Sequence, residues 1–448
     1  QQQGLILARV CLPVQQVSGG IVDLQVYEGR LGEVKLEIGP GVKVSRELLE
    51  RIVAPLREHP VVERGLIEQV LLTIEDLHGI GATSTLKATD EVGVADLEIK
   101  IAAGPPHGGS VEYDNAGSIY TGRNRFYAGF DQYNLVGWGD VASLRAQAST
   151  GTQYVRAGWL TPINELGTRV VLSASYLTYD LRTALYERMG AEGSAQGYAL
   201  QAFHPAIRSL NHNLYLQGSV ERRLFTDKLE AFGVEIRKDT TLATLGFNGD
   251  ARDDLWGGGA NSYAATASFG HLDINTPIDA AMDELGYRTR GHYAKLNLAA
   301  SRLQALPNHD YAFLGLQAQV GSNNLDSSEK FSLGGLNGVR GYAPTESPSD
   351  AAAVVTWEYR KVLNIPADAY GSSWVASVFG DYGWGQQHKT PLASDSDNTR
   401  FLVSHGLGLS YANSRGSFVK LSIAARGNTP GLSDDSHVRF LLQASQQF

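Results

Sequence analysis

Residues 331–342 read Phe-Ser-Leu-Gly-Gly-Leu-Asn-Gly-Val-Arg-Gly-Tyr, and no other stretch says more about how this chain folds. The stretch places one arginine, Arg340, in a loop that is rich in glycine. Its glycines are Gly334, Gly335, Gly338 and Gly341. Because glycine adopts positive φ angles and allows close backbone approach, such a loop can fold back into a confined space. Strongly alternating segments flank it on both sides, which predicts a functional loop between two strands.

The composition favours strands and turns over helices. The chain has 448 residues, with Gly 50 against Pro 15, and it also contains Tyr 20 and Phe 14. Its mean hydropathy of −0.18 is ordinary for a water-soluble protein. A transmembrane barrel has the same average, because only alternate residues meet lipid. The net charge of −9, with no cluster of basic residues, argues against a nucleic-acid-binding protein.

From about residue 107 the sequence alternates with period two. In 213–224, Leu214, Leu216 and Val220 share one face, and polar side chains share the other. About sixteen such segments lie between Val111 and Phe448, an even number of nearly membrane-spanning length. We therefore predict a transmembrane β-barrel of about 16 antiparallel strands. The lumen of such a barrel is too wide for side chains alone to fill, so a segment must plug it or pass through it.

The first part of the chain predicts a small α+β domain. A strand over 31–38 is followed by a helix from an N-cap at Ser45 to about Leu56. A second helix follows Val62 and stops before Gly79. Strands over 83–88 and 94–101 complete the order β-α-α-β-β.

Together these features resemble the Omp85 superfamily of outer-membrane proteins, and within it the transporters of two-partner secretion. The resemblance rests on Val339-Arg-Gly-Tyr342 in a long loop, on Phe379-Gly-Asp-Tyr-Gly383 further along, and on the aromatic last residue, Phe448. It also rests on the β-α-α-β-β region, which resembles a periplasmic POTRA domain. The passage Arg-Val-Cys-Leu-Pro-Val-Gln over 9–15 resembles the one that joins two POTRA domains in this family.

The resemblance implies a domain order and a set of site residues. Residues 1–29 would be the closing part of a first, truncated POTRA domain, 30–103 a complete one, and 107–448 the barrel, with its long loop at about 321–350. The loop motif comprises Gly334, Gly335, Val339, Arg340, Gly341 and Tyr342, and the barrel-wall motif comprises Phe379, Asp381 and Gly383. Arg340 would bind Asp381 inside the lumen. Phe440 and Phe448 would form the signal read by the barrel-assembly machinery.

The function that the resemblance implies is export of an unfolded partner protein across the outer membrane of a Gram-negative bacterium. POTRA domains in the periplasm would recognise that partner, and the protein would be a monomer without enzymatic activity, nucleotide hydrolysis or cofactor. An adhesin, a cytolysin, a contact-dependent toxin and a haem-acquisition protein all fit as the exported partner. The alternative is an insertase of the same superfamily, which assembles other outer-membrane barrels.

Three further patterns have weaker functional interpretations. The stretch 134–142 contains a G-x-G-x-x-A string, but the alternation that follows favours a barrel turn over a dinucleotide site. Asp250, Asp253 and Asp254 predict a solvated loop cluster, with calcium binding as the alternative. Eleven histidines show no zinc spacing, and the single cysteine, Cys11, excludes an intrachain disulfide.

Overall fold

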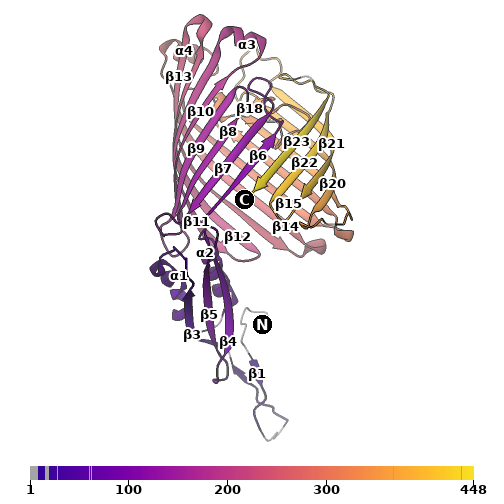
Figure 1. Ribbon diagram of the computed structural model, residues 1–448. Coiled ribbons are helices and arrows are strands. Elements are labelled where there is room, and N and C mark those ends of the chain that lie inside the picture. The colour runs from indigo at the N-terminus through magenta and orange to yellow at the C-terminus, as the bar shows by residue number, and fades with distance from the viewer. Residues whose placement is uncertain are drawn as a thin grey trace.

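The computed structural model describes residues 9–15, 20–27, 29–59, 61, 63–366, 368–434 and 436–448. It consists of a large barrel and a small α+β domain beneath one side of it (Figure 1). Near the N-terminus, β1 (Arg9–Cys11) and β2 (Gln25–Tyr27) form a separate antiparallel pair. The proposed POTRA segment at 1–29 lies partly outside the described residues.

The α+β domain contains β3 (Arg30–Ile38), α1 (Arg46–Glu58), α2 (Arg64–Glu75), β4 (Ile80–Ala88) and β5 (Val94–Ala103). This is the predicted order β-α-α-β-β. The strands form a sheet in the order β3-β5-β4, with a core between sheet and helices. The predicted N-cap, Ser45, precedes α1, but its side chain makes no capping hydrogen bond to the described part of the chain. Its backbone N–H instead donates to Gly137 of the barrel.

Sixteen strands close the barrel, which confirms the predicted number. They are β6 (His107–Asp114), β7 (Arg125–Tyr133), β8 (Val141–Ala148), β9 (Thr152–Pro162), β10 (Arg169–Asp180), β11 (Ala191–Arg208), β12 (His212–Leu229), β13 (Val234–Asp253), β14 (Gly259–Ile274), β15 (Gly291–Ala305), β16 (Tyr311–Gly321), β19 (Ala351–Val362), β20 (Ser373–Gln386), β21 (Thr399–Ala412), β22 (Ser417–Arg426) and β23 (Val438–Gln447). Each strand is antiparallel to its neighbours, and β23 pairs with β6 to close the ring. The hairpins farthest from the α+β domain carry α3 (Ala184–Met189) and α4 (Pro277–Leu285).

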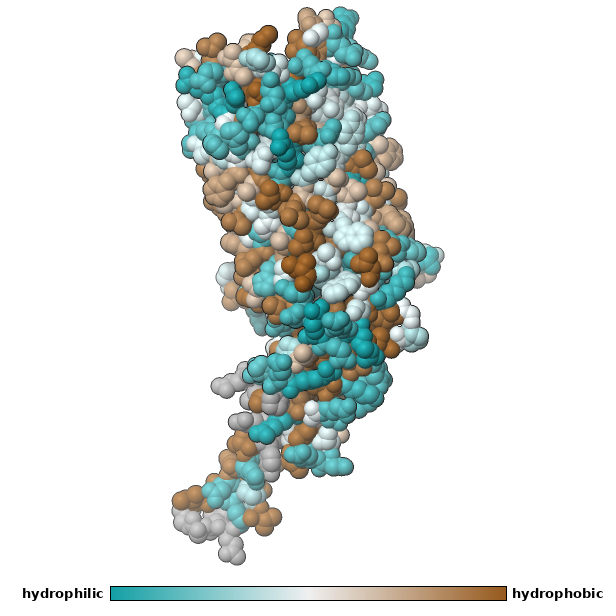
Figure 2. All heavy atoms as spheres, turned by 90° about the vertical axis from the view of Figure 1, so that its left-hand side faces the viewer, coloured by the Kyte–Doolittle hydropathy of each residue, from teal (hydrophilic) through white to brown (hydrophobic). Residues whose placement is uncertain are grey.

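An apolar belt surrounds the middle of the barrel. Leu216 pairs with Phe247 and Val220 with Ala243, so these side chains share the outer face. In Figure 2 the middle of the visible barrel face is mainly hydrophobic, and the regions above and below it are mainly hydrophilic. This distribution fits a wall that meets lipid at mid-height and water at both ends. Within the part of the chain that the structure describes, no helix combines the length and apolar character that a membrane span requires.

The barrel wall is much taller on one side than on the other. Strand β13 has 20 residues and β12 has 18, whereas β6 and β8 have 8 each. The outer-face residue Arg222 of β12 forms an ion pair with Asp239 of β13, above the apolar belt. The tall strands therefore continue into water on the side away from the α+β domain (Figure 1).

Candidate functional site

The connection between β16 and β19 folds back into the barrel lumen. It contains η4 (Ser327–Glu329) and a short hairpin of β17 (Phe331–Ser332) and β18 (Pro348–Ser349). At its tip, three buried side chains pack against three buried residues of the inner wall. The loop residues are Leu333, Val339 and Tyr342, and the wall residues are Ala352, Val354 and Leu402. The loop thus has an apolar core of its own, formed with the barrel.

Arg340 binds two carboxylates of the wall. Its Nε and Nη2 donate to Asp381 at 2.9 and 2.7 Å, and its backbone N–H donates to the same carboxylate at 3.0 Å. Its Nη1 donates to Glu358 at 2.5 Å. Arg340, Asp381 and Glu358 are 5%, 0% and 4% exposed. The structure therefore brings Arg340 and Asp381 together in the bidentate geometry that a guanidinium favours.

The remaining motif residues shape this contact. The guanidinium carbon of Arg340 lies 3.4 Å from the ring centroid of Phe379, so the cation stacks on the aromatic face. A Cβ at Gly383 would lie 2.7 Å from Val339, and one at Gly341 would lie 2.8 Å from the side chain of Ser404. Glycine at these positions allows loop and wall to touch.

Three other predicted loop residues complete the tip. Gly335 has a φ of 100°, in the region that favours glycine, and Gly334 forms an isolated bridge to Val339. The Tyr342 hydroxyl donates to the backbone oxygen of Thr429, at 2.8 Å. This bond ties the tip to the connection between β22 and β23.

Sequence reasoning missed most of the loop's other polar contacts. Glu358 was not predicted as a partner of Arg340. At the root of the loop, the buried Glu329 forms ion pairs with Arg223 at 2.9 Å and Lys295 at 2.8 Å. The fully buried Glu346 accepts hydrogen bonds from the backbone of Leu432 and Ser433. Charged residues at inward positions of alternating strands were the available signal for such contacts.

Phe440 and Phe448 lie apart from the loop. Phe440 is on the outer face of β23 and is 69% exposed. Phe448 exchanges two backbone hydrogen bonds with Gly109, at 2.9 and 3.0 Å, and its side chain is 67% exposed. The structure thus places Phe440 on β23, the strand that closes the barrel, and Phe448 directly after its end.

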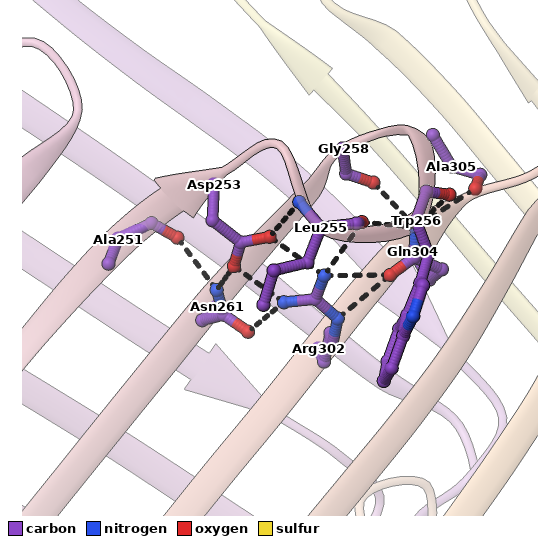
Figure 3. Close-up of polar contacts among 9 residues, drawn as sticks. All are labelled: Ala251, Asp253, Leu255, Trp256, Gly258, Asn261, Arg302, Gln304 and Ala305. Atoms are coloured by element: carbon purple, nitrogen blue, oxygen red, sulfur yellow. Dashed lines mark hydrogen bonds and ion pairs between the residues drawn. The ribbon is translucent and has the colours of Figure 1, made fainter.

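The prediction that Asp250, Asp253 and Asp254 form a loop cluster is wrong for the first two, because only Asp254 lies in the turn after β13. Asp250 and Asp253 both belong to β13, where alternation turns them to opposite faces. Asp250 accepts from Asn213, and Asp253 binds the Arg302 guanidinium at 2.7 and 2.9 Å (Figure 3). Arg302 also bonds the side chains of Asn261 and Gln304. The carboxylate of Asp253 therefore stabilises a strand end.

Comparison with known proteins identifies the family. The pattern of the family described as "Haemolysin secretion/activation protein ShlB/FhaC/HecB" matches residues 93–411. The chain belongs to this family. It is therefore an outer-membrane β-barrel transporter of two-partner secretion, within the Omp85 superfamily, that exports a partner protein. The family, the fold and this function were all predicted from the sequence, and all three are confirmed.

Individual relatives agree with this assignment. The transporter is 29% identical over 425 residues to the heme/hemopexin transporter protein HuxB of Haemophilus influenzae strain 86-028NP, covering 94% of this chain and 74% of HuxB. It is 25% identical over 354 residues to the outer membrane transporter CdiB of Dickeya dadantii, covering 76% of this chain and 60% of CdiB.

Solved structures support the fold of the transporter. CdiB from Escherichia coli superposes with a TM-score of 0.78 at 20% identity, covering 100% of this chain and 82% of that one. BamA from Haemophilus ducreyi lacking POTRA domains 1–3 gives a TM-score of 0.61 at 15% identity, covering 99% and 90%. At these identities the likeness concerns the fold alone.

Proposed function

We propose that the α+β domain captures the unfolded partner protein in the periplasm, and that the partner crosses the lumen after the loop tip leaves the inner wall. The observation that carries this proposal is the buried contact of Arg340 with Asp381 and Glu358. It holds a loop in the space that a translocating chain must use. The transport cycle needs neither an enzymatic step nor a nucleotide, because folding of the partner outside supplies directionality.

Capture uses the free edge of β4. In the described chain, β4 pairs with β5 along 80–88, and its other edge has no partner strand in the sheet. An extended polypeptide can add to such an edge through main-chain hydrogen bonds. On the opposite edge, by contrast, Arg57 of α1 donates to the carbonyl of Val34 in β3. The exposed edge at β4 is therefore the better acceptor.

Passage requires only the loop tip to move. A cavity of about 630 Å³ lies in the lumen beside the tip and is lined by Leu336, Asn337 and Arg340. Wall residues of both charges, including Asp250 and Lys420, line the same cavity. Displacing the tip would join this cavity to the volume that the tip now fills. A wall of mixed charge offers contacts to many sequences without binding any one tightly.

We also propose a role for each part of the chain. Residues 30–103 form a complete POTRA domain, 107–448 form the barrel, and β1 and β2 belong to a preceding POTRA domain. The transporter acts as a monomer, and Phe440 and Phe448 serve as its assembly signal. The exposure of both aromatic residues, one on the closing strand and one directly after it, supports this last assignment.

The test compares host cells with and without the transporter. We expect one large protein to disappear from the medium and accumulate in the periplasm of cells that lack it. A photo-crosslinking residue at Thr85 of β4 should capture that protein, whereas one at Glu47 on the exposed face of α1 should not. Depletion of many outer-membrane barrels, with an unchanged set of secreted proteins, would support the insertase alternative instead.

A further inference from the structure

The turn between β7 and β8 has a rigid, self-contained geometry. It spans Asn134–Asp140, the stretch whose glycines suggested a nucleotide fingerprint. The buried Asp140 carboxylate accepts hydrogen bonds from the backbone N–H groups of Leu135, Val136 and Trp138. Asn134 adopts a φ of 55° and donates its backbone N–H to the backbone carbonyl oxygen of Asp140. These bonds fix the shape of the turn from within.

The outside of this turn fits the POTRA domain. The Gly137 carbonyl accepts from the Ser45 backbone N–H at 2.7 Å, at the start of α1. The Asn134 side chain donates to the carbonyl of His78, just after α2, at 2.5 Å. Trp138 lies under the guanidinium of Arg51, 5.8 Å from its ring centroid. One turn thus contacts the domain at the N-terminal end of α1 and beyond the C-terminal end of α2.

The close contact between the turn and the POTRA domain requires glycine at two positions of the turn. Gly137 and Gly139 have φ values of 81° and 76°. A Cβ at Gly137 would lie 2.8 Å from the carbonyl oxygen of Lys43, and one at Gly139 would lie 2.6 Å from Leu77. Both obstacles belong to the POTRA domain. A hairpin of the barrel alone would need no such space.

A second contact fastens the same corner of the domain. Asp76, at the C-terminal end of α2, accepts two hydrogen bonds from Arg208 of β11, at 2.9 and 3.2 Å. Arg169 of β10 lies 3.8 Å from the same carboxylate. The side chains of Asp76, Arg169 and Arg208 are only 16–20% exposed, so solvent screens the ion pairs of Asp76 less than it would at an open surface. The contact lies on strands other than β7 and β8, so it resists rotation about the turn.

We propose that the Asn134–Asp140 turn and Arg208 form a fixed joint that holds the POTRA domain at one angle to the barrel, and that export requires this angle. The covalent link alone cannot set the angle, because a single segment leaves rotation about its own bonds. Two separated contacts remove that rotation and keep the free edge of β4 in one place relative to the pore. The requirement for export rests on the proposed function, whereas the fixed angle does not.

The test measures the angle directly. Spin labels at Lys87→Cys on β4 and Asn364→Cys in the turn after β19 would be placed on a Cys11→Ser background, and their distance measured by double electron–electron resonance in lipid bilayers. We expect one narrow distance distribution for the unmodified joint. Gly139→Ala disrupts the contact of the turn and Arg208→Gln disrupts the contact with Asp76. Together the two substitutions should broaden the distance distribution. Export should be lost at unchanged barrel abundance.

Gly416→Ala is the matched control. Gly416 has a φ of 77° in the turn between β21 and β22, and its added Cβ would meet Gln447 of the barrel rather than the POTRA domain. It should leave the distance distribution narrow. A broad distance distribution in the unmodified protein, or a narrow one in the double variant, would refute the proposal of a fixed joint. Broadening without loss of export would overturn its role in transport but leave the proposed function standing.

Discussion

Removing Arg340 should release the loop tip without unfolding the barrel. Among the described residues, Ser404 and Thr356 are the side-chain donors that the fully buried Asp381 keeps in the Arg340→Ala variant, at 2.8 and 3.1 Å. Breaking a buried ion pair by removing one partner costs roughly 3–5 kcal/mol, because the other charge stays buried and unpaired. That cost falls on the docked loop, since an undocked loop admits water to the carboxylate.

This free energy can be measured as local opening. A Leu333→Cys probe on the Cys11→Ser background is fully buried against the inner wall and reacts with a thiol reagent only when the tip lifts. A loss of about 3 kcal/mol should raise the alkylation rate roughly a hundredfold, because each 1.4 kcal/mol is a factor of ten. Arg156→Ala is the control, since it removes an inward arginine whose side chain bonds Ser173 of the wall.

Asp381→Ala should raise the rate by a similar factor, and the double variant should exceed neither single variant by much. Both substitutions break the same contact, so their effects on the opening free energy do not add. An additive result, roughly a ten-thousandfold increase in the double variant, would show that the residues stabilise the loop separately. An unchanged rate in Arg340→Ala would refute the reasoning altogether.

Three further predictions concern the lipid face, a loop clasp and pH. Leu296→Lys on the outer face should destabilise the folded barrel by roughly 2–4 kcal/mol and so reduce the folded fraction, which heat-modifiable electrophoresis measures. Asn297→Lys in the lumen should be tolerated. Glu346→Ala removes the acceptor for two backbone N–H groups of the β22–β23 connection, which should then become sensitive to protease while strand content, measured by circular dichroism, stays constant. Burial first, and then the nearby Lys330, lower the pKa of His388 in the connection after β20. The folded state therefore binds this proton less readily than the unfolded state, so His388 contributes its full stability above about pH 6.5 and loses it as the pH falls toward its folded pKa. Thermal unfolding should show this slope, and His388→Phe should remove it.

The sequence predicted the barrel well because alternation is a local property. The alternation of apolar and polar residues within one strand indicates which side chains face lipid. Leu296 and Asn297 could therefore be assigned without knowledge of the neighbouring strands. The pairing of Arg340 with Asp381 needed the family resemblance, since the two residues are 41 positions apart in the sequence. Glu358 and Glu346 were missed because their partners depend on strand stagger and on the path of the loop. The Asn134–Asp140 turn was recognised as a turn, but its fit to another domain exists only in three dimensions.

The uneven height of the barrel has a practical consequence. The hairpin top of the tall wall at Glu230–Phe232 stands clear of the apolar belt (Figure 1), whereas α4 packs through Ala280 against a cluster that contains Leu325 of the folded loop. An epitope or fluorophore inserted at Glu230–Phe232 would show whether the transporter is exposed on the surface of living cells, and it would not enter the lipid. Because side chains alternate along each strand, an insertion within these strands keeps every later residue on its own face only if it adds residues in pairs. The tall wall is therefore a ready-made site for external labelling.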